Sequence, residues 1–118
     1  MKNALILAIT VTLSLPALAF SDPAPTNPKL LSGNPSIHDY PKAALKQRLE
    51  GMTSMNLYIT KSGKLSTCEI TESSGHSILD QASCRMMAFK ARFSPAKDIN
   101  GENVAAILPH RINWTLPK

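Results

Sequence analysis

Residues 73–96, SSGHSILDQASCRMMAFKARFSPA, decide the fold, because they combine a turn, an amphipathic helix and a stop. Ser77 is expected to cap the helix, with Asp80 completing a capping box and placing a negative charge in the first turn. Apolar residues at helical spacing predict one buried face: Leu79, Ala82, Met86, Phe89 and Phe93. Two cations suited to the last turn and a terminating proline follow: Lys90, Arg92 and Pro95. The remaining elements should pack on this helix.

Residues 1–19 have the pattern of a secretory signal peptide. One Lys precedes an uncharged apolar run, and an Ala-Leu-Ala sequence supplies the small residues of a cleavage site. We expect cleavage between Ala19 and Phe20, which would release an exported protein. The alternative is an uncleaved anchor in the inner membrane, but the run is short for a membrane span and Pro16 interrupts it.

Length and charge limit the remaining chain to one small domain with a modest core. Residues 1–19 hold one of the 13 Lys and Arg residues and none of the 8 Asp and Glu residues, so cleavage lowers the net charge from +5 to +4. The positive charges are dispersed, and aromatic residues make up only 5% of the sequence. Nucleic-acid binding favours a basic stripe with interleaved aromatic side chains, so we expect no nucleic-acid partner.

The only two cysteines are Cys68 and Cys84. An even number of cysteines in an exported protein favours a disulfide. Here it would close a loop of about 16 residues and stabilise the fold by about 3 kcal/mol. Two free buried thiols are the alternative. A redox-active pair is not expected, because the Cys-x-x-Cys spacing is absent.

Residues 20–37 are expected to form a linker or irregular arm before the domain, which we place at residues 38–118. The arm contains four prolines together with Gly, Ser, Asn and Asp residues. A short helix is expected over Lys42–Leu49, where Ala and Leu favour helix and Gly51 is a natural stop.

Alternating apolar and polar residues predict three strands. Thr53–Ile59 and Leu65–Thr71 flank a turn and form a β-hairpin, and Asn103–Leu116 is a long third strand. Pro109 cannot donate to a ladder, so the third strand belongs at an edge of the sheet. Because a helix separates the second and third strands, the third should pair beside the first. The fold class is therefore α+β, with two helices on one face of a three-stranded antiparallel sheet.

Residues 40–116 resemble the C-terminal domain of TonB-type energy transducers. The positions that carry the resemblance are Tyr40-Pro41, Ala44, Glu50-Gly51, Gly63, Ser73-Ser74-Gly75, Leu79-Asp80, Arg92-Phe93-Ser94-Pro95-Ala96, Gly101, Pro109 and Trp114. The cysteine pair is similar to that of a subset of small exported members. The arm is shorter than the Pro-rich spacer of a complete transducer.

The resemblance implies a function as well as a fold. Family members bind a short extended segment of outer-membrane receptors, the TonB box, by adding it as a strand to the edge formed by their final strand. Here that edge corresponds to residues 103–116. The residues expected along it are Ala105, Ile107, Pro109, Arg111 and Asn113. Main-chain hydrogen bonds would provide affinity, and alternate side chains would provide specificity.

The residues leave two other functions open. An exposed edge strand invites pairing between copies, so one alternative is a self-associating envelope protein without receptors, such as a homodimer. The other is an exported hydrolase using Ser74 and His76, although no set of nucleophile, base and orienting group is evident. His38, His76 and His110 lack metal-ligand spacing. We therefore expect no enzyme activity, no small-molecule substrate, no metal and no cofactor.

Overall fold

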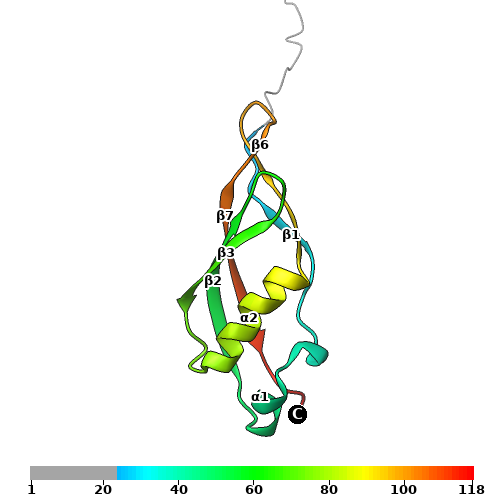
Figure 1. Cartoon of the computed structure of the whole chain (residues 1–118), viewed down its shortest axis with the longest axis vertical. Helices are drawn as coiled ribbons and strands as arrows, with labels where there is room; N and C mark the ends of the chain where they lie inside the picture. The colour runs from blue at the N-terminus through cyan, green and yellow to red at the C-terminus, as the bar shows by residue number, and fades with distance from the viewer. Residues whose placement is uncertain (1–23) are drawn as a thin grey trace, which may run out of the picture.

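The structure is a computed structural model that describes residues 24–118 (Figure 1). In chain order the elements are β1 (Lys29–Ser32), the 3₁₀ helix η1 (Ile37–Asp39), α1 (Lys42–Lys46), β2 (Gly51–Ile59), β3 (Leu65–Glu72), α2 (Ser77–Phe89), β4 (Arg92–Ser94), β5 (Ala96–Lys97), β6 (Asn103–Val104) and β7 (Ala106–Trp114). The predicted signal peptide at residues 1–19, with its cleavage site between Ala19 and Phe20, lies outside the described residues.

The centre of the molecule is a three-stranded antiparallel sheet in the order β3-β2-β7. β2 pairs with β7 from Gly51–Trp114 to Ile59–Ala106 with no shift in register. In Figure 1, α2 crosses one face of this sheet, and α1 lies at the end of the molecule where the chain terminates. The predicted α+β fold class is confirmed, including the central position of the first hairpin strand.

One face of the sheet and both helices enclose a single core. Its fully or nearly fully buried side chains include Ala44 in α1, Met55, Leu57 and Ile59 in β2, Leu79, Met86 and Met87 in α2, and Ile112 and Trp114 in β7. Successive strand residues point to opposite faces, so the alternation seen in the sequence selects this buried set.

α2 is shorter at its C-terminal end than the sequence predicts. The helix ends at Phe89, with Lys90 as its C-cap, and Arg92–Ser94 forms β4 instead of a last helical turn. β4 pairs with β1, which places the buried Phe93 opposite Leu30. The spacing of Phe93 predicted backbone hydrogen bonds within the helix, but this segment forms them with β1 instead. The buried position expected for Phe89 is also wrong, because its side chain is 86% exposed.

The start of α2 differs from the predicted capping box. His76, not Ser77, is the N-cap residue. Asp80 does lie in the first turn. Its carboxylate bonds the preceding turn, at Ser73 and Ser74, so it does not close a box with Ser77.

Part of the predicted irregular arm is a strand. β1 pairs with β4, and Thr26 and Lys97 exchange two backbone hydrogen bonds of 2.9 and 3.1 Å. None of the four prolines of the arm falls within β1, so its backbone donors remain available for pairing. The arm is thereby held against the segment that follows α2.

α1 ends at Lys46, before the predicted end at Leu49, and Gly51 does not stop it. Arg48 has a φ of 51°, which takes the chain out of helical geometry. Gly51 is the first residue of β2, and a Cβ there would lie 2.5 Å from the carbonyl oxygen of Ser74. This glycine therefore permits a close approach of two backbones.

The predicted last strand is divided into two. Asn103–Val104 forms β6, which turns back on β5, whereas β7 begins at Ala106 and pairs with β2. The alternation over residues 103–116 has no break that marks this change of partner. Ala105 lies between the two strands and is not part of the β7 edge.

Candidate functional site

β7 forms one edge of the sheet. Within residues 24–118 it pairs with β2 alone, so no described strand occupies its other side. The ladder that it forms with β2 is regular from end to end. A regular edge of this length presents a row of backbone groups with which a further strand can pair.

The alternation of backbone groups identifies which β7 residues face the free side. The amide of Thr60 donates to the carbonyl of Lys64 at 2.8 Å, so Thr60 faces β3. Successive residues of an antiparallel strand face opposite neighbours, so the odd-numbered residues of β2 bond the even-numbered residues of β7. The residues whose backbone groups point away from the sheet are Ile107, Pro109, Arg111 and Asn113. Pro109 fits this position, because it has no N–H to donate to β2.

Four of the five predicted edge residues come together on this strand. The side chains of Ile107, Pro109, Arg111 and Asn113 are all exposed, and they alternate with the inward-facing residues of β7. Ala105 is exposed too, but it precedes the strand. The free edge therefore runs from Ile107 to Asn113.

A hollow of about 440 Å³ lies over the sheet beside this edge. Arg111 is in register with Ser54 of β2, and Ser54 is in register with Glu72 of β3. A cation, a hydroxyl and a carboxylate thus cross the sheet in one row. Pro109 lies opposite Asn56 in the neighbouring row. The side chains closest to the free edge can therefore recognise polar groups on a partner.

Trp114 anchors the end of β7 from beneath and is 2% exposed. Its indole N–H donates to the hydroxyl of Ser83 at 2.9 Å, and that hydroxyl donates to the carbonyl of Leu79 at 2.8 Å. The indole meets the ring of Tyr40 edge to face, with 5.0 Å between the ring centroids. The Tyr40 hydroxyl donates to the carbonyl of Leu49. These contacts fix the strand to both helical segments.

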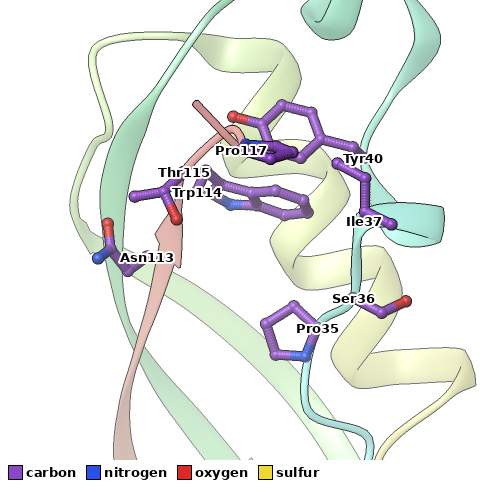
Figure 2. A pocket seen from close by; sticks show the side chains of 8 residues that line it. All are labelled: Pro35, Ser36, Ile37, Tyr40, Asn113, Trp114, Thr115 and Pro117. Atoms are coloured by element: carbon purple, nitrogen blue, oxygen red, sulfur yellow. The ribbon is translucent and has the colours of Figure 1, made fainter.

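A pocket of about 170 Å³ lies at this end of β7, between the strand and the arm (Figure 2). Its lining residues are Pro35, Ser36, Ile37, Tyr40, Asn113, Trp114, Thr115 and Pro117. In Figure 2 the rings of Tyr40, Trp114 and Pro117 lie close together, with Pro35 of the arm on the other side. The arm thus limits the free edge just beyond Asn113.

The opposite edge, β3, is fixed to the helix by the disulfide between Cys68 and Cys84. The two Cα atoms lie 5.7 Å apart. β2 and β3 shift register twice, between Ser54 and Met55 and between Tyr58 and Ile59. This edge is therefore both irregular and covalently fixed.

Asp80 organises the turn between β3 and α2. Its carboxylate accepts hydrogen bonds from the Thr53 hydroxyl at 2.9 Å, from the Ser74 amide and hydroxyl at 2.9 and 2.8 Å, and from the Ser73 hydroxyl. Burial acts to raise the pKa of Asp80, but these hydrogen bonds outweigh it and hold the pKa below the ordinary value of 3.8. The Ser74 hydroxyl also lies 3.0 Å from the carbonyl oxygen of His76. Ser74 thus bonds a carboxylate and backbone groups, as in a structural turn.

The three histidines belong to separate elements. His38 lies in η1, His76 caps α2 and His110 lies in β7, where burial lowers its pKa. Among residues 24–118, no three His, Cys, Asp or Glu side chains gather into a group that could hold a metal ion. None of the helices described for the chain has the length and apolar character needed to cross a membrane.

The side-chain network under β7 is the part that the sequence analysis missed. Ser83 lies four residues after Leu79 and three before Met86, so helical spacing could have placed it on the buried face. A buried hydroxyl requires a hydrogen-bond partner. The sequence does not reveal that partner, because Trp114 is 31 residues away.

A family model described as Gram-negative bacterial TonB protein C-terminal matches residues 38–116. The chain belongs to this family. A solved structure, the solution NMR structure of the Pseudomonas aeruginosa TonB C-terminal domain, is 27% identical to it. That match has a TM-score of 0.60 and covers 86% of this chain and 93% of the other. No curated protein sequence matches the chain.

Membership of the TonB C-terminal family implies interaction with TonB-dependent receptors in energy transduction. Such domains are periplasmic and generally non-enzymatic. The resemblance drawn from the sequence motifs is therefore confirmed.

Proposed function

We propose that this protein binds an extended peptide segment, such as the TonB box of an outer-membrane receptor, by adding it as a strand to the free edge of β7. The observation that carries the proposal is the unbroken register of β7 on β2, which aligns the outward backbone groups from Ile107 to Asn113. Strand addition uses such a row for affinity. Family membership supplies the class of partner.

The hydrogen bonds available to the added strand follow from the outward residues. Ile107, Arg111 and Asn113 each offer an N–H and a C=O, whereas Pro109 offers a C=O alone. A carbonyl of the partner strand that faces Pro109 therefore receives no hydrogen bond from β7. Beside it, Arg111 supplies the one cation of the edge and favours an acidic or polar side chain in the partner.

The setting of this function is the periplasm, after cleavage between Ala19 and Phe20. The domain at residues 38–118 would then act together with β1 of the arm, because β1 pairs with β4 within the folded unit. A disulfide between Cys68 and Cys84 agrees with an oxidising compartment.

The experiment is an NMR titration of the exported protein with a synthetic peptide that copies a TonB box. The amides of Ile107, Arg111 and Asn113 should shift, while the amides of Cys68 and Ile70 on the β3 edge should remain in place. Unchanged β7 amides at saturating peptide concentrations would refute strand addition here.

Two variants at one position separate backbone from side-chain recognition. Arg111→Pro removes the side chain together with an outward N–H that β2 does not use. The lost N–H should by itself weaken binding by about tenfold, the value of one hydrogen bond of about 1.4 kcal/mol. Arg111→Ala keeps that N–H and removes the side chain, and it should cost less. Equal losses in the two variants would show that the side chain, not the edge backbone, carries affinity.

A further inference from the structure

The C-terminal end of α2 carries the most exposed of the large apolar side chains described. Phe89 is 86% exposed, and Leu31 of β1 is 64% exposed. Both line one hollow, so they belong to a single surface. We call Leu31, Lys64, Arg85, Phe89 and Arg92 the Phe89 patch. None of these residues belongs to the β7 edge or to the Trp114 network beneath it. Exposed apolar side chains that share one surface with a rim of charged residues mark an interaction site.

Phe89 forms a ridge between two hollows. The larger, of about 500 Å³, has an apolar floor that includes Leu65, Met87 and Phe93. The smaller, of about 300 Å³, is lined by Ala82, Arg85 and Met86 among others. Phe89 lines both. The Phe89 side chain fills neither hollow and stays 86% exposed between them.

The charges around Phe89 are almost all positive. Lys64 and Arg92 line the larger hollow, which has no acidic residue in its wall. Arg85 and Lys90 line the smaller hollow, whose one acidic residue, Asp39, pairs with Lys90 at 2.6 Å. Burial would raise the pKa of Asp39, but its bonds to Lys90 and Ser36 lower it overall, so this carboxylate stays charged and paired. Lys64, Arg85 and Arg92 remain to meet an external anion.

We infer that the Phe89 patch docks on an anionic lipid surface. Phe89 and Leu31 would enter the layer between head groups and acyl chains, and the three cations would contact the anionic head groups. The cations come from the β2–β3 turn, α2 and β4, and their side chains are long and exposed. Such an arrangement fits mobile head groups better than the fixed carboxylates of one protein partner.

The test is flotation of the exported protein with vesicles of phosphatidylcholine, either pure or mixed equally with phosphatidylglycerol. Binding should require the anionic lipid and should fall as salt rises. Phe89→Ala should lower the partition coefficient by about tenfold, the loss expected when one aromatic side chain no longer leaves water. Unfolding curves should match those of the unchanged protein, because Phe89 is exposed and Ala favours helix.

The chain offers matched controls. Leu31 and Ile99 are both 64% exposed, but Ile99 lies in the β5–β6 loop outside the patch, so Leu31→Ala should weaken binding and Ile99→Ala should not. Likewise, Arg92→Gln should weaken it more than Lys46→Gln on α1. Equal losses within either pair would overturn the assignment of the site. Equal binding to neutral vesicles, or none to either kind, would overturn the lipid as ligand, and the second result would favour an acidic protein segment.

Discussion

The two edges of the sheet are held by different means. β3 is joined covalently to α2 through Cys68 and Cys84, and its register with β2 shifts twice. The disulfide does not involve β7, which pairs with β2 without a register shift and is anchored by the buried Trp114 and its hydrogen bond to Ser83. Bulges and short pairing runs protect an edge from further strands, whereas a regular ladder does not.

This difference explains why one edge is the candidate site although both are exposed. The shifts in β3 break the even spacing of its outward groups, so an added strand would lose pairing at each one. On β7 the only interruption is Pro109, which removes one donor without shifting the strand. The protein thus keeps one edge irregular and the other available.

Removal of the Trp114 side chain, which anchors the β7 edge, should cause the largest loss of stability. Trp114→Ala should lower the free energy of unfolding by about 3–5 kcal/mol, because it leaves a cavity under β7 and removes the N–H that donates to the buried Ser83 hydroxyl. Urea denaturation measures this loss. The neighbouring Asn113→Ala, on the exposed face, should change stability by less than about 0.5 kcal/mol. A small loss for Trp114→Ala would mean that packing does not hold β7.

Removal of the disulfide is the corresponding test on the other edge. The double variant Cys68→Ser and Cys84→Ser should lower the free energy of unfolding by about 3 kcal/mol, because the unfolded chain regains the entropy of a 16-residue loop. At temperatures where the variant stays folded, peptide shifts on β7 should persist. Their disappearance would show that the two edges are coupled rather than independent.

The sequence predicts the sheet and its strand order from features that lie within single segments. These are the alternation of apolar and polar residues and the missing N–H of Pro109, which places its strand at an edge. The prediction fails where the partner of a segment is distant. Phe93 continues a helical apolar pattern, yet its backbone pairs with β1, and Ala105 continues a strand pattern at a change of partner. For the same reason, four edge residues could be named in advance, whereas Ser83 beneath Trp114 could not. The spacing of apolar residues identifies which face of a strand or helix is buried, but it does not identify the distant segment that packs against that face.

Asp80 should have an intermediate effect, since it links β2 with the turn that follows β3. Asp80→Asn should lower the free energy of unfolding by about 1–2 kcal/mol near neutral pH, because several hydrogen bonds lose a charged acceptor. The folded-state pKa of Asp80 is below 3.8, so this stabilisation is present above that pH and is lost as pH falls through the folded pKa.

Denaturation curves at several pH values test this prediction. The difference between the protein and the Asp80→Asn variant should shrink below pH 3.8 and stay constant above about pH 5. Glu69→Gln, an exposed change on β3, serves as the control and should leave the acid limb of the curve unchanged. A difference that stays constant into strong acid would mean that the charge of Asp80 is not what stabilises the turn.

Pro109 should have the smallest effect on the folded domain and the most direct bearing on the free edge. Pro109→Ala adds one outward N–H to β7 without removing any bond to β2, so stability should change by less than about 1 kcal/mol. The free edge then offers donors at every outward position, and pairing with a second copy should strengthen. Sedimentation across a concentration series should show more dimer for Pro109→Ala than for the unchanged protein.

The exposed change Ser66→Ala on β3 should show no such increase. If Pro109→Ala dimerises no more than Ser66→Ala, then Pro109 does not restrain pairing at this edge, and the regular register of β7 alone would have to explain its selectivity for a peptide.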